Sequence, residues 1–427
     1  MTSMTDMTGD ALNTFHAQAT ERLAQLTSNR MQLDLTRGKP STEQTALSDA
    51  LDGALNGDYR AEDGTDTRNY GGLRGLPEAR RLGAELLRCD ASQVIAGGNS
   101  SLSLMHLVLD TALEKGLHAG MAPWRASEGA AVLTPVPGYD RHFALTETLG
   151  VGMVNIGMDD NGPDMDAARR LVENDERIKG IWCVPKYSNP TGCVYSDEVV
   201  QAIAELPKLA AADNFVVLWD NAYAVHDFDF PGTELASLSA AAQAAGTLDH
   251  TVQFASTSKV TFAGAGISFV ASDEAVLAQL ERQLSFTTIG PDKVNQLRHT
   301  RFLGGRVAEH MAAHAALLRP KFELVEQMLS EHLGGLDIAE WTHPKGGYFV
   351  SLDVRPGLAK RIVAMAGEVG LKLTAAGATF PYGQDPNDSN IRIAPTFADL
   401  DALEAAMEVL VLCVMLATAE QRLAKQK

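Results

Sequence analysis

The sequence lacks the features that mark zinc-binding, redox-active and nucleic-acid-binding proteins. Among its 427 residues there are four cysteines, and no two of them form a C-x-x-C pair. The spacing therefore indicates neither a zinc site nor a redox dithiol, and we expect no metal. Lys and Arg number 36 against 54 Asp and Glu, a formal net charge of −18. An acidic chain of this kind lacks the basic face that nucleic acid or an anionic membrane needs in a partner.

Targeting and membrane segments are also missing from the pattern. We expect no apolar run to be long enough to span a bilayer. Residues 1–10 are polar and rich in Thr and Met, without the apolar stretch of an export signal. We therefore expect a cytoplasmic protein with no membrane partner and with a short disordered N-terminus.

What the sequence does contain is an alternation of strand-like and helix-like segments. Hydrophobic residues make up 45% and charged residues 21%, which is typical of a soluble globular enzyme with room for two domains. Strands alternating with helices predict right-handed crossovers and a mainly parallel sheet, and ligands bind beyond the carboxyl ends of such strands. The strand-like runs are residues 94–96, 130–134, 151–156, 180–184, 215–219 and 252–255.

Polar turns follow several of these runs. Gly97-Gly98-Asn99-Ser100 leads into a helix, so its free backbone N–H groups and the positive end of the helix dipole can bind an anion such as phosphate. The signal is weak alone, because many loops begin a helix in this way. Arg37-Gly38-Lys39 places two cations around a glycine, a pattern that fits either a carboxylate site or a solvated turn.

Asp220 follows the continuous apolar run 215–219 and should lie at the rim of a buried strand. An acid there needs a partner or must stay protonated. A pyridinium nitrogen is such a partner, and Tyr223 could reach a phenolate oxygen on the same ring. The alternative is an aspartate that caps a helix at a strand end.

Lys259 is the centre of this interpretation. It follows the strand-like run 252–255 and precedes a Gly-rich segment, so it should sit on a turn at the end of a buried strand. Desolvation lowers the pKa of a lysine, and the neutral amine then forms a Schiff base with a carbonyl. The alternative for an isolated S-x-S-K is a solvated lysine beside a strand end.

The C-terminal part predicts a second, smaller domain. A long helix over 298–332 should link the two domains. It is followed by a strand at 346–352, a helix at 359–369, a strand at 390–394 and a closing helix at 399–425.

Taken together, these residues resemble fold-type I pyridoxal phosphate (PLP) enzymes, specifically class I aminotransferases, and most of all the class Ic aspartate aminotransferases of bacteria. The resemblance covers nearly the whole chain, in order and in spacing. Its most specific parts are the S-N-P-T-G turn and the D-x-x-Y pair. The motifs that carry it are the Tyr70 loop, Gly98-Asn99-Ser100, Tyr139, Ser188-Asn189-Pro190-Thr191-Gly192, Asp220 with Tyr223, Ser256-Thr257-Ser258-Lys259, and Asn390-Ile391-Arg392.

The resemblance implies an α/β fold: a large PLP domain with a mainly parallel seven-stranded sheet flanked by helices, plus a smaller α+β domain. The large domain would comprise residues 46–300 and the small domain 301–427, with residues 1–45 as an N-terminal arm packing on the small domain. It also implies a homodimer with shared active sites.

The resemblance assigns roles around the cofactor. Lys259 would hold PLP as a Schiff base and, once freed by substrate, move a proton between the substrate Cα and the cofactor. Asp220 would pair with the pyridinium nitrogen, with His142 behind it. Tyr223 and Asn189 would hydrogen-bond the ring oxygen.

Further positions follow from the same resemblance. Tyr139 would stack on the ring face, and Tyr70 would reach the phosphate from the neighbouring subunit. The remaining phosphate ligands implied are Asn99, Ser100, Ser256 and Ser258.

On the substrate side, the resemblance implies that Arg392 clamps the α-carboxylate bidentately, with Asn189 beside it and Gly38 closing over it. A dicarboxylate needs a second cation, because an unpaired buried carboxylate is costly. The candidates are Arg37, Lys39 and Arg141, and we favour Arg37 or Lys39 because they flank Gly38.

The sequence departs from the family at one position. Many relatives carry a phosphate-binding arginine eight residues after the Schiff-base lysine, whereas this chain has Ile267 there. Lys293 is a candidate replacement, acting from its own chain or from the partner subunit, and the alternative is a surface charge near a helix start.

The function implied is transamination between an amino acid, most simply L-aspartate, and a 2-oxo acid, most simply 2-oxoglutarate. Two alternatives remain open. One is another PLP reaction on the same fold, such as a β-lyase or a decarboxylase, because the cofactor does the chemistry in all of them. The other is a non-catalytic regulator, although regulators of this type add a basic DNA-binding domain.

Overall fold

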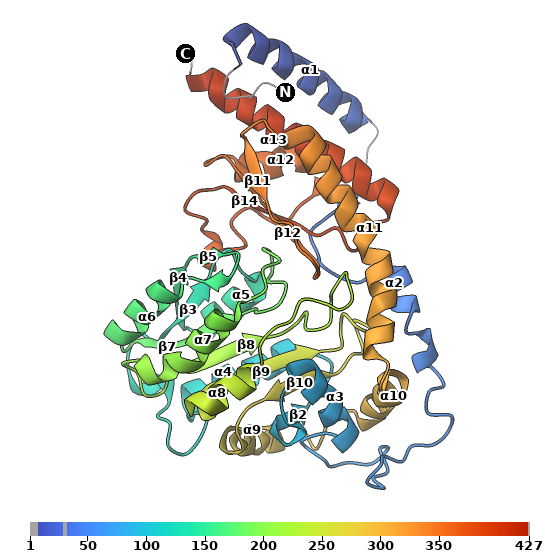
Figure 1. The fold of residues 1–427 in the computed structure, drawn as a ribbon, viewed down its shortest axis with the longest axis vertical. Coiled ribbons are helices and arrows are strands. Elements are labelled where there is room, and N and C mark those ends of the chain that lie inside the picture. Colours follow the sequence, from blue (N-terminus) through green and yellow to red (C-terminus); the bar gives the residue numbers. More distant parts are fainter. Residues whose placement is uncertain (1–6, 29–31, 426–427) are drawn as a thin grey trace.

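The computed structural model describes residues 7–28 and 32–425. Residues 1–6 of the predicted disordered stretch therefore lie outside the described residues. Two sheets organise the chain, a large one in the lower part of Figure 1 and a small one above it. Helix α11 (Val307–Leu333) runs from the lower part of the molecule to the upper part (Figure 1).

The large sheet has seven strands in the order β2-β10-β9-β8-β7-β3-β4. Strand β10 is antiparallel to both neighbours, and the pairs from β9 to β4 are parallel. The predicted fold class is therefore confirmed, although β10 itself was not predicted. The strands are β2 (Val94–Ala96), β3 (Ala131–Pro135), β4 (Gly152–Ile156), β7 (Ile178–Cys183), β8 (Val216–Asp220), β9 (Thr251–Ser256) and β10 (Ser268–Ala271).

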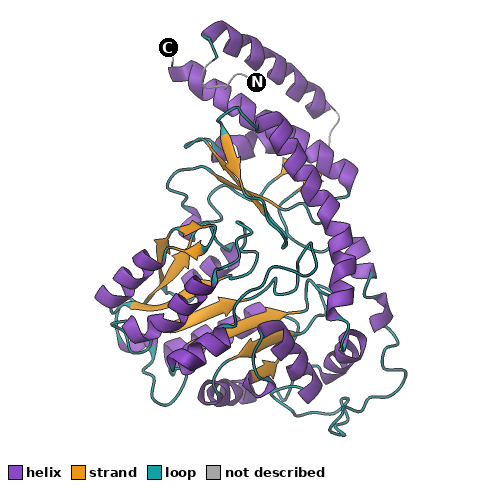
Figure 2. Cartoon of the chain, in the orientation of Figure 1, coloured by secondary structure: helices purple, strands orange, loops and turns teal. Residues whose placement is uncertain are grey.

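Helices cover both faces of this sheet (Figure 2). In β8, Val216 and Leu218 pack with α4 and α9 on one face, whereas Val217 and Trp219 pack with α6, α7 and α8 on the other. Side chains alternate between faces, so a strand covered on both must be apolar throughout. The helices are α4 (Ser101–Glu114), α9 (Glu274–Thr287), α6 (Met165–Asn174), α7 (Asp197–Leu209) and α8 (Leu238–Ala245).

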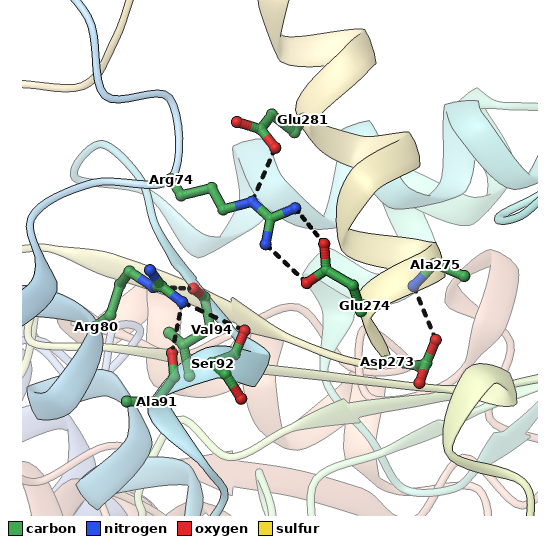
Figure 3. Close-up of polar contacts among 9 residues, drawn as sticks. All are labelled: Arg74, Arg80, Ala91, Ser92, Val94, Asp273, Glu274, Ala275 and Glu281. Atoms are coloured by element: carbon green, nitrogen blue, oxygen red, sulfur yellow. Dashed lines mark hydrogen bonds and ion pairs between the residues drawn. The ribbon is translucent and has the colours of Figure 1, made fainter.

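Polar contacts fasten the loop that follows Tyr70 to this layer of helices. Figure 3 shows Arg74 between two acids of α9, with its Nε 2.8 Å from Glu281 and its two terminal nitrogens 2.8 and 2.7 Å from Glu274. Asp273 caps the same helix by accepting from the Ala275 N–H at 2.8 Å. Nearby, Arg80 of α3 (Pro77–Leu87) donates to backbone carbonyls at the start of β2.

The long helix predicted over 298–332 is wrong as a single element. The chain forms α10 (Lys293–Leu303), breaks at Gly304-Gly305, and resumes as α11. Gly305 has φ +69, a left-handed conformation that glycine adopts at no steric cost. The glycine pair therefore ends one helix and turns the chain into the next.

The C-terminal part forms a small antiparallel sheet in the order β11-β12-β14. The strand expected from residue 346 begins only at Val350, because Gly347 has φ +82 and its N–H donates to the His226 carbonyl at 2.9 Å. The elements of this part are β11 (Ala339–Trp341), β12 (Val350–Val354), α12 (Ala359–Val369), β13 (Leu371–Lys372), β14 (Asn390–Ile393) and α13 (Leu400–Lys425).

The N-terminal segment packs on this C-terminal part. Helix α1 (Gly9–Ser28) lies along α13 (Figure 1), and Leu12 and Ala19 belong to the same buried cluster as α12 and α13. Strand β1 (Leu33–Asp34) pairs in parallel with β13. The exact domain boundaries at residues 45 and 300 stay a prediction. The remaining elements are α2 (Thr42–Ala46), α5 (Asp140–Thr148), β5 (Met158–Asp159) and β6 (Gly162–Pro163).

The expectation that no apolar run could span a bilayer is wrong by length and composition. Among the described residues, α13 is the one helix that is long and apolar enough. However, 78% of its apolar window is buried, and it packs against α1, α11 and α12. This burial is what a core helix of the C-terminal part requires.

A buried histidine makes stability depend on pH. His299 of α10 is fully buried, with Nδ1 2.8 Å from the Asn295 carbonyl and Nε2 2.9 Å from the Thr261 hydroxyl. Burial lowers the pKa of His299 from 6.5 to about 4. Between these values the unfolded chain binds a proton that the folded chain does not, so stability falls as the pH drops.

We expect His299 alone to remove roughly 2 kcal/mol of unfolding free energy between pH 7 and pH 5. His299→Gln should therefore lose less stability than the wild type over this interval, measured by urea unfolding at both pH values. The control is His332→Gln, which changes an exposed histidine of α11. An equal loss in His299→Gln and the wild type would show that His299 titrates alike in both states.

Candidate active site

A cavity of about 260 Å³ opens at the carboxyl ends of the parallel strands. The loops that follow β2, β3, β7, β8 and β9 all contribute to it, as expected for this sheet topology. A larger cavity of about 500 Å³ lies between α3 and α10 and contains none of the predicted site residues. The predicted residues that line the smaller cavity are Asn99, Ser100, Tyr139, Asn189, Asp220, Tyr223, Ser256, Ser258 and Lys259.

Lys259 lies on the turn just after β9, partly buried at the cavity. Its Nζ is 4.9 Å from the ring centroid of Tyr223 and 6.0 Å from that of Tyr348. Desolvation lowers the pKa of Lys259, and the charge of Asp220 acts in the opposite direction. Burial of the amine therefore favours its neutral, nucleophilic form.

Asp220 ends β8 and is 3% exposed. Its Oδ2 accepts a hydrogen bond from His142 Nε2 at 2.9 Å, and the His142 ring stacks on Trp182 with centroids 4.0 Å apart. Oδ1 of Asp220 is buried and has no hydrogen-bond partner. A buried carboxylate oxygen without a partner is costly, so this one is suited to a cationic N–H group in the cavity.

An anion site adjoins this carboxylate at the start of α4. Ser100 is the N-cap of this helix and makes no capping hydrogen bond with its own side chain. Asn99 donates from Nδ2 to the Gly264 carbonyl at 3.0 Å, and the Ser258 hydroxyl lies 3.3 Å from the Asn99 carbonyl. The free N–H groups of the first helical turn face the same region, which favours a phosphate there.

Two tyrosines border the space between the lysine and the carboxylate. Burial raises the pKa of both Tyr139 and Tyr223, so both keep their phenolic protons at neutral pH. Tyr139 stands edge-on to His142, with ring centroids 4.9 Å apart. The cavity thus offers a flat aromatic wall and a neutral phenol that can donate a hydrogen bond.

Arg392 approaches the cavity from β14 of the small sheet. It is 7% exposed, and its Nη1 donates to Asn189 Oδ1 at 3.2 Å and to Asp140 Oδ1 at 2.9 Å. Its guanidinium lies over the Phe349 ring at 5.0 Å. A Cβ added to Gly38 would lie 2.4 Å from Phe349 Cζ, so the packing around this arginine requires glycine at position 38.

Four of the predicted residues outside the cavity lining have exposed side chains. Arg37, Lys39 and Arg141 are exposed, and the Nζ of Lys39 lies 3.7 Å over the Phe397 ring. Tyr70 is 82% exposed. Their predicted roles stay predictions.

The position at which many relatives carry a phosphate-binding arginine belongs to the hydrophobic core in this chain. Ile267 is fully buried in the cluster that α3 shares with β2 and β10. Lys293 is not a surface charge: it is 3% exposed, and its Nζ donates to the carbonyls of Asn69 and Gly71 at 2.8 and 2.5 Å. It therefore holds the Tyr70 loop, whereas its role toward a phosphate stays a prediction.

Sequence reasoning missed three residues around Arg392. Asp140 and Phe349 contact its guanidinium directly, and the Thr374 hydroxyl lies 3.2 Å from Nη2. Asp140 stands next to Tyr139, which was the one available signal. Nothing in the sequence connects it to an arginine 252 positions away.

A second group of polar side chains lies outside the cavity lining. One ligand atom each of His118, Asp249 and His250 lies within 4.8 Å of the others, close enough for a metal ion. However, Nδ1 of His118 accepts from the Gly120 N–H at 3.2 Å, which leaves Nε2 carrying the proton in the neutral ring. The expectation of no metal stays a prediction.

Comparisons with known proteins agree with this geometry. A family model described as aspartate amino-transferase matches residues 7–427. An aspartate aminotransferase of Corynebacterium glutamicum is 42% identical over 98% of this chain and 97% of its own length.

Solved structures give the same result. The crystal structure of an aspartate transaminase from Corynebacterium glutamicum superposes with a TM-score of 0.94 at 42% identity, covering 98% of this chain and 99% of that one. LysN, an α-aminoadipate aminotransferase of Thermus thermophilus in complex with N-(5′-phosphopyridoxyl)-L-leucine, shares the fold with a TM-score of 0.75 at 20% identity, covering 96% of both chains.

Proposed function

Because this chain belongs to the aspartate amino-transferase family and is an aminotransferase, we propose that it moves the amino group of L-aspartate to 2-oxoglutarate with pyridoxal phosphate as cofactor. One observation carries the cofactor proposal. The unpaired Oδ1 of Asp220 and the amine of Lys259, whose pKa is lowered by burial, border the same cavity. The name of the 42%-identical relative supports aspartate as the donor.

The residues present fit this cofactor. When bound, pyridoxal phosphate supplies a carbonyl for amine chemistry and a cationic ring that takes up electrons from Cα. Asp220 would hold the proton on the ring nitrogen through its unpaired Oδ1, while His142 occupies Oδ2 and fixes the carboxylate. Tyr223 and Asn189 would donate to the ring oxygen, and Tyr139 would cover the ring face.

Other side chains hold the phosphate and the substrate. Asn99, Ser100, Ser256 and Ser258 line the cavity at the start of α4 and would hold the phosphate there. Arg392 binds the α-carboxylate, because its planar fork matches a carboxylate bidentately. Lys259 would anchor the cofactor covalently and, once the substrate amine has displaced it, would move the proton at the substrate Cα as a neutral amine.

The test is a panel of amino donors, each mixed with 2-oxoglutarate, in which the amino-acid product and the cofactor absorbance are followed. We expect the purified protein to be yellow and to react with aspartate ahead of the other donors. Lys259→Ala should turn over no donor, because the amine that carries cofactor and proton is gone.

Other outcomes would contradict the proposal. Transamination by Lys259→Ala at the wild-type rate would remove the Schiff-base assignment. Release of ammonia or carbon dioxide in place of an amino-acid product would indicate β-lyase or decarboxylase chemistry. An inactive but PLP-loaded wild type would favour the regulator. The cytoplasmic location stays a prediction.

The second carboxylate of a dicarboxylic substrate needs a cation besides Arg392. We propose Arg37 or Lys39, which flank Gly38 beside the arginine clamp. Both side chains are exposed and neither is held in the core, although the Nζ of Lys39 would have to leave the Phe397 ring to reach a substrate. Arg141, at the start of α5, is the remaining candidate.

Arg37→Ala or Lys39→Ala should raise KM for aspartate far more than for alanine, which has no distal carboxylate. One charge-assisted contact corresponds to roughly ten- to a hundredfold in kcat/KM. Steady-state kinetics with both donors measure this, and alanine serves as the internal control. If aspartate and alanine suffer equally in both variants, the distal clamp lies elsewhere and Arg141 is the next position to change.

A homodimer completes the proposal. Three large apolar side chains are strongly exposed near one another: Tyr70 at 82%, Phe286 at 78% and Ile289 at 64%. The Gly71 N–H donates to the Ile289 carbonyl at 3.0 Å, which joins the Tyr70 loop to the end of α9. An exposed apolar cluster of this kind marks an interaction surface, and we infer that a second copy of the chain covers it and receives Tyr70.

Ile289→Asp should weaken this association, because it places a charge in an apolar contact. We expect the wild type to have twice the chain mass by light scattering, and the variant to shift toward the monomer. Leu400→Asp is the control, since it changes another exposed apolar residue at the start of α13. A monomeric wild type, or a variant that stays fully dimeric, would contradict the assigned surface.

A further inference from the structure

The buried guanidinium of Arg392 already has a carboxylate partner within the chain. Its Nη1 lies 2.9 Å from Asp140 Oδ1, and the two side chains are 6% and 33% exposed. Among the described residues, this is the one carboxylate that pairs with Arg392. Asp140 therefore occupies the nitrogen at which a substrate carboxylate would bind.

The other nitrogens of Arg392 offer a ligand no better place to bind than Nη1. Nε is buried and has no partner, and Nη2 faces the Thr374 hydroxyl at 3.2 Å and the Thr36 carbonyl at 3.5 Å. Nη1 instead contacts Asn189, which lines the cavity. A carboxylate that enters through the cavity therefore reaches the arginine at the side that Asp140 holds.

The position of Asp140 allows its side chain to move away from Arg392. It is the first residue of α5, directly after the N-cap Tyr139, and it is partly exposed while Arg392 is not. A rotation of its side chain takes the carboxylate into water, where it stays next to the positive end of the helix dipole. The arginine has no such freedom, because it is packed over Phe349.

We propose that Asp140 is an internal stand-in for the substrate carboxylate. It pairs with Arg392 when no substrate is present and is displaced when a substrate carboxylate binds. This inference rests on the proposed function, in which Arg392 is the carboxylate clamp. The residue thereby lowers the affinity of the site for every carboxylate, and it sets this affinity without touching the reacting atoms.

The direction of the effect follows from electrostatics. A buried guanidinium without a counter-ion is strongly destabilising, so the pair supports the protein while it is empty. Two carboxylates on the same edge of one guanidinium repel each other, so the incoming anion must first break the internal pair. Part of its binding free energy is used in that exchange, which weakens the apparent affinity.

The experiment uses PLP-loaded protein and succinate, a dicarboxylate with no amino or oxo group to react. Its dissociation constant is measured by isothermal titration calorimetry at fixed ionic strength. Asp140→Asn should bind succinate about tenfold more tightly than the wild type, the size of effect that one competing charge-assisted contact produces. Its melting temperature without ligand should be lower, and succinate should raise it more than in the wild type.

Glu147→Gln is the matched control. Glu147 lies on the same helix, is exposed, and its removal changes the net charge by the same amount. It should bind succinate as the wild type does. If Asp140→Asn is too unstable to titrate, Asp140→Ser replaces it, since serine suits the first turn of a helix.

Two results would overturn the inference. Unchanged or weaker succinate binding in Asp140→Asn would mean that the carboxylate stays on Arg392 and orients it. Unchanged succinate binding in Arg392→Gln would mean that the anion binds elsewhere. Transamination of aspartate by the wild type is measured in parallel. If the wild type shows no transamination while Asp140→Asn binds succinate more tightly, the proposed function is rejected and the role of Asp140 as a stand-in for a carboxylate is kept.

Discussion

The burial of both faces of the large sheet is the constraint from which the site follows. A strand with helices on either side favours apolar side chains along its length, as Val216 to Trp219 show in β8. The strand ends are therefore the places where charged groups can reach a cavity. Because five of the strands run in parallel, their carboxyl ends meet at one edge. Asp220, Lys259 and Asn189 come together there although they lie far apart in the sequence.

The same burial explains which elements the sequence predicts well. Helix α12 was placed with its correct ends, and β8 and β9 to within a residue, because apolar periodicity and breaker residues are local signals. The break at Gly304-Gly305 was missed because flanking helical patterns continue on both sides. Strand β10 was missed because four residues after a Gly-rich loop carry little signal. The closing helix α13 was placed correctly, but its apolar length was underestimated.

For the site, family resemblance and strand ends together identified most of the polar residues that line the cavity. They could not place Arg37, Lys39 or Arg141, because an exposed long side chain has no sequence-encoded direction. Nor could they find Asp140 as the partner of Arg392. That ion pair joins α5 to β14, and contacts between distant elements depend on how the two sheets are positioned, which no local pattern encodes.

Arg392 connects three parts of the structure that lie far apart in the sequence. It belongs to the small sheet, yet its donors reach Asp140 and Asn189 at the large sheet and the Thr36 carbonyl of the N-terminal segment. The anion paired with this arginine is therefore also a contact between the two sheets. Any carboxylate that replaces Asp140 takes over that contact, so ligand binding and the relative position of the sheets act on the same few atoms. A clamp built in this way stays ordered in the absence of substrate, because the protein provides its own carboxylate.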